Sequence, residues 1–157
     1  MRRCPQPVVS LVQGAAAGGG FALALASDIR LCTPDARMHA AFIKVGLSGC
    51  DVGMSYLLPR ALGSSVAAEM LMTGSVLDAA RAAALGFVSA VVPAAELEQA
   101  GARMVDSLLQ ADPLGLALTK QGLQVGIDAP GIEWAVANED RQQALLSGAD
   151  EFRRRMQ

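Results

Sequence analysis

The chain has 157 residues and a net charge of −2 at pH 7, and 52% of its residues are hydrophobic although only 4% are aromatic. This length is enough for one domain with a sizeable core, and the weakly acidic balance excludes a general attraction for nucleic acid. Three cysteines without a C-x-x-C pair and a single histidine argue against a disulfide framework and a zinc site of ordinary spacing, so we expect reduced thiols, no metal and a cytoplasmic protein.

Residues 8–26 form the stretch around which the chain is organised. The β-branched apolar run Val8–Val12 predicts a strand, and the alanine- and leucine-rich run Phe21–Ala26 predicts a helix. Between them the glycines Gly18–Gly20 have no Cβ, so a ligand can approach the backbone closely. Since the first N–H groups of a helix lack intrahelical partners, this turn predicts a site for an anion or a developing oxyanion.

The same stretch has two competing interpretations. A transmembrane helix needs about twenty apolar residues, and a signal peptide needs a basic start followed by an apolar region. Ser10 and Gln13 interrupt the apolar run, the glycines weaken its middle, and Pro5 and Pro7 stand at its beginning. We therefore favour a chain without a membrane segment and keep insertion or export as an alternative that cell fractionation tests.

The following residues predict short alternating strands and helices. Strands are expected at Ile29–Cys32 and Met38–Ile43, followed by a glycine-rich loop over residues 45–53. A short helix is expected at Met54–Leu58, because Pro59 is poorly placed to continue it.

Three further signals complete the α/β part. Ser64 predicts the N-cap of a helix through Met72. Asp78 predicts the start of a shorter helix that closes at Gly86, and Phe87–Val92 predicts a buried strand.

From residue 93 onward the pattern is helical. Asp112 and Pro113 supply an N-cap and a first-turn proline for one of these helices. We therefore predict a single α/β domain over residues 1–157, with an α/β part over 1–92 and a helical, oligomerising part over 93–157.

The order of these motifs resembles the signature of the crotonase superfamily, the enoyl-CoA hydratase/isomerase family. The likeness begins with the strand, glycine turn and helix and continues at the expected distances over essentially the whole chain. The segments that carry it are Pro7-Val8-Val9, Val12-Gln13-Gly14, Ala17-Gly18-Gly19-Gly20, Ala26-Ser27-Asp28-Ile29, Gly46-Leu47, Leu58-Pro59-Arg60, Met72-Thr73-Gly74, Leu85-Gly86-Phe87-Val88 and Asn138-Glu139-Asp140-Arg141-Gln142-Gln143.

This resemblance implies a fold and a chemistry. The fold is a strand–strand–helix spiral followed by C-terminal helices that drive assembly into trimers, which often pair into hexamers. The substrates are acyl-CoA thioesters, and no cofactor is used, because CoA enters only as part of the substrate. Two backbone N–H groups hold the thioester oxygen as it becomes an enolate, and one of these donors maps onto Gly19. The substrate pocket maps onto Ala22, Phe42, Gly46 and Leu47.

Both catalytic glutamates of the family's hydratases are replaced in this chain. The first maps onto Ala22 and the second onto Phe42, and neither side chain can transfer a proton, so two-glutamate hydration of a 2-enoyl-CoA is not expected. Asp51 resembles the aspartate that some isomerases of the superfamily place in this loop, where it would act as acid or base. Alternatively, Asp51 caps its own turn between Gly49 and Gly53.

Both ends of the chain are short of the family's pattern. The resemblance implies that the other oxyanion donor and much of the CoA-binding loop would precede Met1, and that the closing helix would extend beyond Gln157. We expect a truncated form, either a mis-started reading of a longer gene or a degenerate copy. Its function is then either that of an isomerase or hydratase acting on an acyl-CoA, or that of a non-catalytic acyl-CoA-binding protein or subunit.

Overall fold

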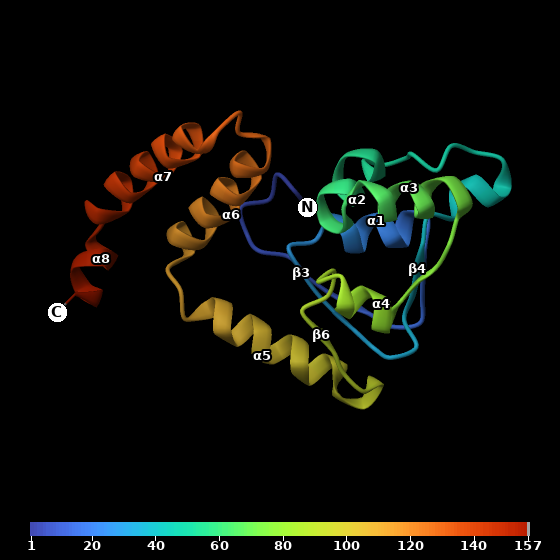
Figure 1. The fold of residues 1–157 in the computed structure, drawn as a ribbon. Helices are drawn as coiled ribbons and strands as arrows, with labels where there is room; N and C mark the ends of the chain where they lie inside the picture. The colour runs from blue at the N-terminus through green and yellow to red at the C-terminus, as the bar shows by residue number, and fades with distance from the viewer. Residues whose placement is uncertain (157) are drawn as a thin grey trace. The chain divides into compact units, whose positions relative to one another are not determined.

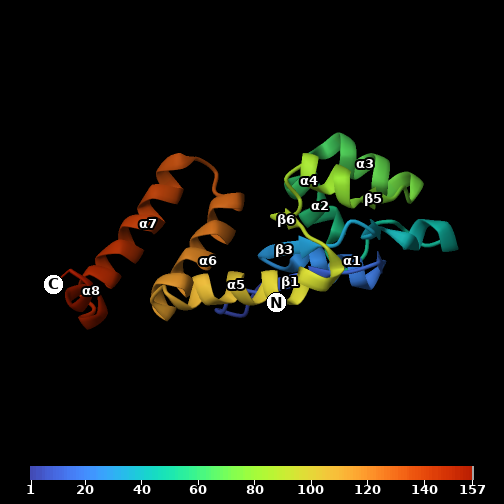
Figure 2. The ribbon, with the colours of Figure 1, turned by 90° about the horizontal axis from the view of Figure 1, so that it is seen from below.

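The computed structural model describes residues 1–156, which group into two compact units. The N-terminal unit contains residues 1–2 and 8–105, and the helical unit contains residues 3–7 and the chain from residue 106 onward. Figures 1 and 2 show the helices and strands of both units from two directions. The assignment of one domain to the whole chain stays a prediction.

Two three-stranded sheets form the frame of the N-terminal unit. The strands are β1 (Val9–Val12), β2 (Ala15–Ala17), β3 (Ile29–Cys32), β4 (Arg37–His39), β5 (Leu77–Asp78) and β6 (Ala90–Val91). One sheet has the order β1-β3-β6 with parallel pairs. The other has the order β2-β4-β5, in which β2 and β4 are parallel and β4 and β5 antiparallel. The consecutive strands β1 and β2 therefore each lie at the edge of a sheet.

Two of the predicted strands differ from the structure. The strand expected over Met38–Ile43 ends at His39, and a 3₁₀ helix, η1 (Ala41–Val45), takes its second half. The strand expected over Phe87–Val92 pairs only at Ala90–Val91, and Phe87 and Val88 belong to the hydrophobic core instead. Neither β2 nor β5 is predicted, since three alanines and a two-residue strand carry no β signal.

Helices surround these sheets and then make up the rest of the chain. The predicted N-cap at Asp78 is confirmed, because its Oδ1 accepts the N–H of Arg81 over 2.8 Å. The predicted N-cap at Ser64 is wrong, because Ser64 is the first residue of its helix and Gly63 precedes it without a side-chain cap. The helices of the N-terminal unit are α1 (Gly19–Ala26), α2 (Met54–Leu62), α3 (Ser64–Thr73), α4 (Ala79–Ala84), the 3₁₀ helix η2 (Ala94–Glu96) and α5 (Leu97–Leu109), whose last turn passes into the helical unit.

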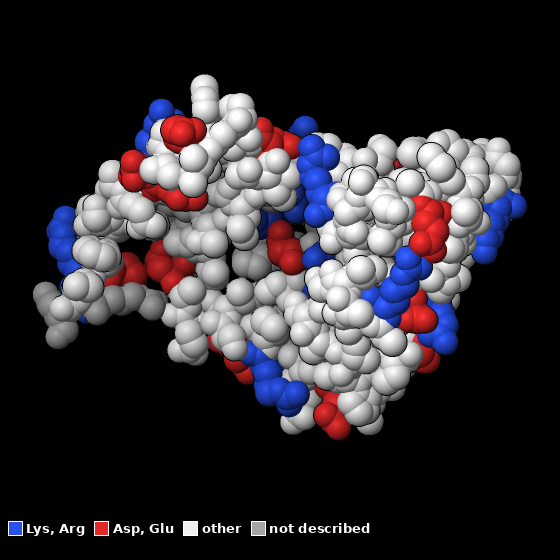
Figure 3. Space-filling model, in the orientation of Figure 1, with Lys and Arg blue, Asp and Glu red and all other residues white. Residues whose placement is uncertain are grey.

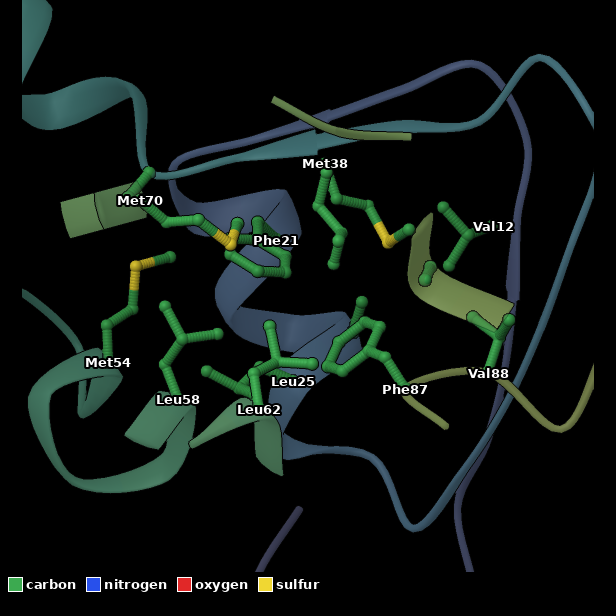
Figure 4. Close-up of a cluster of buried hydrophobic side chains, with 14 of the residues drawn as sticks. Val12, Phe21, Leu25, Met38, Met54, Leu58, Leu62, Met70, Phe87 and Val88 are labelled. Atoms are coloured by element: carbon green, nitrogen blue, oxygen red, sulfur yellow. The ribbon is translucent and has the colours of Figure 1, made fainter. Parts of the chain in front are cut away.

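The hydrophobic core of the N-terminal unit gathers around α1 (Figure 4). Phe21 is fully buried and meets the Phe87 ring edge-on, with 5.9 Å between the ring centroids. The guanidinium of Arg30 lies over the Phe87 ring, 4.7 Å from its centre. This core holds α1, and with it the glycine turn at its start, against the sheets.

Helix α2 continues through Pro59, contrary to the prediction that it ends at Leu58. Met54, Leu58 and Leu62 recur every four residues and bury one face of the helix in the core (Figure 4). Each such side chain contributes about 1.5–3 kcal/mol, which together exceeds the cost of about 3 kcal/mol for a proline within a helix. Burial therefore overrides the local signal of Pro59.

The helical unit contains α6 (Pro113–Asp128), α7 (Ile132–Ser147) and α8 (Asp150–Arg155), with α6 packed against α7 (Figure 1). The predicted cap of α6 is confirmed, because the Asp112 carboxylate accepts the N–H of Gly115 over 2.6 Å. Lys120 is buried in α6, and its ammonium donates to the carbonyl oxygen of Gln6 over 2.8 Å. Within residues 1–156, no helix combines the length and the apolar character that crossing a bilayer needs.

Candidate functional site

The predicted site begins at the turn between β2 and α1. Gly18 has φ 52° and ψ −115°, a conformation that residues with a Cβ rarely adopt. Its N–H donates to the carbonyl oxygen of His39 over 3.0 Å, which ties the end of β2 to the end of β4. A Cβ on Gly18 would stand 3.4 Å from the ring of Phe42. The backbone conformation therefore favours glycine at this position, whereas a Cβ would only make an ordinary van der Waals contact with the ring.

The next residue, Gly19, is the first of α1 and is exposed. Among residues 1–156 no oxygen accepts a hydrogen bond from the Gly19 N–H, as is usual for the first N–H groups of a helix. The positive end of the dipole of α1 lies at the same place. The N–H of Gly19 can therefore donate to a ligand. It lies on a turn that the Gly18–His39 hydrogen bond ties to the end of β4.

Ala22 and Phe42, onto which the resemblance maps two glutamates, are apolar side chains next to this turn. Ala22 lies one helical turn into α1, 7% exposed and within the core. Phe42 is partly buried on η1, packs against the core and places its ring beside Gly18. Whether these positions are those of the catalytic glutamates stays a prediction.

Gly46 and Leu47 follow Phe42 at the end of η1. Gly46 closes the 3₁₀ helix in the left-handed conformation with φ 80°. Leu47 is 60% exposed, and its N–H donates to the carbonyl oxygen of Phe42 over 3.1 Å. Of the predicted pocket residues, the structure thus brings together Phe42 and the glycine turn, and it leaves Leu47 facing solvent.

Asp51 lies in the loop before α2, and its hydrogen bonds are local. Its Oδ1 accepts the N–H of Val52 over 2.8 Å and its carbonyl oxygen accepts the N–H of Met54 over 2.9 Å. Val52 has φ 41°, the one positive φ at a residue other than glycine within residues 1–156. Gly49 packs so closely on α3 that a Cβ would collide with the carbonyl oxygen of Leu71. Asp51 therefore exposes its carboxylate on a loop that is strained at Val52 and packed against α3 at Gly49.

A second group of charged residues lies on α3 and α4. Glu69 forms a two-pronged ion pair with Arg81, with N–O distances of 2.9 and 2.7 Å, and accepts a third bond from the Ser75 hydroxyl over 3.1 Å. The Arg81 and Ser75 hydrogen bonds lower the pKa of Glu69 from 4.5 to about 2. This exposed pair joins two helices. Because its pKa is low, the Glu69 carboxyl is ionised near neutral pH and has no proton to donate.

Charge elsewhere is dispersed. On the face drawn in Figure 3, acidic and basic side chains are interspersed and form no single-sign patch. In the described part of the chain, no three histidine, cysteine or carboxylate side chains stand close enough to hold a metal ion.

A groove of about 400 Å³ lies in the helical unit at the turn between α6 and α7. None of the predicted site residues lines it. Its walls are Gln121, Gln124, Val125, Asp128, Ala129, Pro130 and Trp134.

The role of His39 is the part of this site that sequence reasoning misses. The residue contributes its backbone carbonyl, and no side-chain pattern reports a backbone contact between strands. The contact follows from the β2–β4 register, in which Ala17 pairs with His39. Because β2 is not predicted from the sequence, this register is not predicted either.

Comparison with known proteins gives a consistent result. A model of the enoyl-CoA hydratase/isomerase family matches residues 1–155. A probable enoyl-CoA hydratase, EchA12, of Mycobacterium tuberculosis is 43% identical over 133 residues, which are 85% of this chain and 47% of that protein. The (E)-benzylidenesuccinyl-CoA hydratase of Thauera aromatica is 34% identical over 129 residues, 80% of this chain and 48% of the relative. The chain therefore spans about half the length of these curated relatives.

Solved structures show the same likeness. The enoyl-CoA hydratase/isomerase of Cupriavidus metallidurans superposes with a TM-score of 0.91 at 39% identity, covering 97% of this chain and 57% of that one. A monofunctional enoyl-CoA isomerase of Mycobacterium smegmatis superposes with a TM-score of 0.78 at 42% identity, covering 86% of this chain and 63% of that one.

Proposed function

Since the chain belongs to the enoyl-CoA hydratase/isomerase family and has the crotonase-like α/β fold that its motifs predict, we propose that it binds an acyl-CoA thioester through the N–H of Gly19. The observation that carries this proposal is the N–H of the exposed residue Gly19. No oxygen of residues 1–156 accepts it, and the bond from the Ala22 N–H to the Gly18 carbonyl oxygen orients its peptide plane. CoA is part of the substrate, and the proposal includes no separate cofactor.

The proposed chemistry is the stabilisation of a thioester enolate. Removal of a proton next to the thioester carbonyl places negative charge on the carbonyl oxygen. A fixed N–H at a helix N-terminus stabilises that charge more than it stabilises the neutral carbonyl. The proposed acyl side of the site consists of Ala22, Phe42, Gly46 and Leu47. Because none of these side chains can transfer a proton, the site has no proton donor for two-glutamate hydration.

Asp51 is the proposed acid or base. A carboxylate that takes a proton from one carbon and returns it to another shifts a double bond without consuming any other reactant. This favours isomerisation or α-proton exchange over hydration.

A second candidate is a non-catalytic acyl-CoA-binding protein. It is favoured by the hydrogen bonds of Asp51, whose carboxylate accepts the N–H of Val52 and so already serves to cap its own loop. In this case Gly19 binds the thioester oxygen and no proton moves.

Assembly and compartment belong to the same proposal. A homotrimer or hexamer is supported by large apolar side chains that α6 and α7 expose, among them Leu123, Ile132 and Trp134. A cytoplasmic location is supported by the cysteines Cys4, Cys32 and Cys50, which are free thiols.

One pair of measurements tests the two candidates. Calorimetry with a 3-enoyl-CoA measures binding, and an assay of the double-bond shift, with ²H exchange at the α-carbon, measures turnover. Asp51→Asn keeps an oxygen for the N–H of Val52 but cannot act as a base, so we expect it to bind as the wild type does and to lose turnover. Binding without turnover in the wild type supports the second candidate, and no binding at all refutes both.

A further inference from the structure

The loop before α2 contains a turn whose conformation its residues disfavour. Residues 51–54 form a β-turn, because the carbonyl oxygen of Asp51 accepts the N–H of Met54 over 2.9 Å. The two central residues, Val52 and Gly53, have φ 41° and φ 87°, which is the type I′ arrangement. Such turns favour asparagine or glycine at their central positions, whereas a β-branched residue at positive φ is an outlier.

The side chain of Val52 does not account for this strain. It is 61% exposed, so its burial within residues 1–156 offsets little of the cost of the backbone conformation. Strained backbone persists only where its surroundings hold it, and it clusters at functional sites. Val52 directly follows Asp51, so the strained residue adjoins the one ionisable side chain assigned to the proposed site.

Both flanks of the turn are fixed. Met54 is fully buried in the hydrophobic core (Figure 4), and the carbonyl oxygen of Gly53 accepts the N–H of Leu57 over 3.0 Å. On the other side, Gly49 packs against the carbonyl group of Leu71, where a Cβ would collide. A change within the turn can therefore leave α2 and the packed end of the loop in place.

The peptide between Asp51 and Val52 can relieve the strain by turning alone. A counter-rotation of ψ at Asp51 and φ at Val52 turns that peptide plane and returns φ of Val52 to negative values. It breaks two hydrogen bonds, from the Met54 N–H to the Asp51 carbonyl oxygen and from the Val52 N–H to Oδ1 of Asp51. The strain at one such residue and the net stabilisation by two hydrogen bonds are of the same order. The two orientations of the peptide are therefore close in free energy.

The two orientations differ in how they hold the Asp51 carboxylate. In the observed turn its Oδ1 accepts the Val52 N–H over 2.8 Å, and within residues 1–156 the other oxygen accepts no hydrogen bond. We propose that Val52 is a positioning residue for Asp51, because its strain brings an orientation that releases the carboxylate for proton transfer close in free energy to the one that holds it on the loop. This inference rests on the proposed function, in which Asp51 is the acid or base.

Two variants at residue 52 test the strain directly. Val52→Asn suits positive φ and should fix the observed turn, whereas the conservative variant Val52→Thr keeps the β-branch and therefore the strain. Hydrogen exchange, resolved by residue in NMR, measures how often the turn opens. The Leu57 amide is the internal reference, because it bonds to Gly53 and not to the turning peptide. We expect the ratio of the Met54 to the Leu57 exchange rate to fall about tenfold in Val52→Asn and to stay unchanged in Val52→Thr.

Turnover is the second readout. The probe is 3-hexenoyl-CoA, with its binding measured by calorimetry and its double-bond shift measured at saturation. We expect Val52→Asn to bind the probe within about twofold of the wild type and to lower turnover about tenfold, and Val52→Thr to keep the turnover of the wild type. A purely structural role of Val52 would leave turnover unchanged, since a variant that only relieves strain raises stability.

Three results overturn the inference and leave the proposed function standing. The first is an unchanged ratio of exchange rates in Val52→Asn, and the second is a Val52→Asn variant that converts the probe as fast as the wild type. The third is an equal loss of turnover in Val52→Asn and Val52→Thr, which would assign the effect to the apolar side chain. A wild type that binds the probe without turnover instead refutes the acid–base role of Asp51, and the role of Val52 with it.

Discussion

The N–H of Gly18 donates to the carbonyl oxygen of His39 over 3.0 Å, and this bond sets where the chain leaves β2 and enters α1. The Gly19 N–H lies in the same peptide plane as the Gly18 carbonyl, whose oxygen accepts the N–H of Ala22 over 3.0 Å, and this second bond orients the Gly19 amide. The Phe42 ring closes the other side of Gly18. The geometry of the proposed binding site thus depends on a backbone contact and an apolar side chain rather than on a charged group.

We expect Gly18→Ala to lower the free energy of unfolding by about 1–3 kcal/mol. Alanine would have to adopt a sparsely populated backbone conformation at φ 52°, with its Cβ 3.4 Å from the Phe42 ring. Gly20→Ala is the matched control, because a Cβ there meets nothing within 4 Å and alanine favours the helix by about 0.5–1 kcal/mol. Urea denaturation measures both, and equal effects at the two positions would contradict the assigned strain.

Arg30 gives a second stability prediction. Its Nε donates to the carbonyl oxygen of Phe87 over 2.7 Å, and a terminal nitrogen donates to that of Ser27 over 2.6 Å. Arg30→Met keeps the apolar stem but leaves these carbonyl groups without their donor, which we expect to cost about 2–4 kcal/mol. Arg37→Met, which removes a more exposed arginine bonded to the Ala36 carbonyl oxygen, should stay within about 0.5 kcal/mol. Thermal and urea unfolding of the two variants would refute the assignment if Arg37→Met proved the more destabilised.

The sequence predicts those parts of the fold whose signals lie in neighbouring residues. The strand, glycine turn and helix of residues 8–26 are predicted because β-branched residues, glycines and alanine-rich periodicity each act locally. Asp78 and Asp112 are predicted as N-caps for the same reason, since a cap bonds to an N–H three residues away.

The features that the sequence fails to predict depend on distant contacts. Helix α2 runs through Pro59 because Met54, Leu58 and Leu62 are buried by other elements. β2 forms from alanines because β4 lies beside it. In the site, the sequence gives the residue types at Ala22 and Phe42. The Gly18–His39 hydrogen bond and the positive φ of Val52 are properties of the folded backbone, which the sequence does not predict.

The Glu69–Arg81 pair predicts a pH dependence of stability in acid. The pKa of Glu69 is lowered from 4.5 to about 2 in the folded protein, chiefly by the Arg81 hydrogen bonds. A lowered carboxyl pKa stabilises the folded state above the unfolded pKa, and this stabilisation is lost as the pH falls through the folded pKa. We therefore expect the stability difference between wild type and Glu69→Gln to be constant above about pH 5, to shrink below pH 4.5 and to be lost below about pH 2.

Urea unfolding at several pH values measures this difference. Because the pair is exposed, salt should reduce it. Glu139→Gln on α7 is the control, since the described residues give this exposed carboxylate no ion pair. The assignment fails if Glu69→Gln and Glu139→Gln show the same dependence on pH.

We expect the amide of Gly19 to bind the thioester oxygen whether or not the protein turns its ligand over. Gly19→Pro removes the N–H at the first position of α1, where a helix tolerates proline and where no internal hydrogen bond is lost. Gly19→Ala keeps the N–H, and its Cβ meets nothing within 4 Å. An isotope-edited infrared spectrum of a bound acyl-CoA carrying ¹³C at the thioester carbonyl reports the hydrogen bond directly.

We expect the carbonyl band to lie below its solution frequency in the wild type and in Gly19→Ala, and to return toward that frequency in Gly19→Pro. Where turnover is measurable, Gly19→Pro should lower it by about a hundred- to a thousandfold, the usual effect of losing one oxyanion donor. An unshifted band in the wild type, or the same lowered band in a bound Gly19→Pro variant, would show that the thioester oxygen lies elsewhere. Because Gly19→Ala differs from Gly19→Pro chiefly in keeping the N–H, a loss confined to the proline variant points to that hydrogen bond.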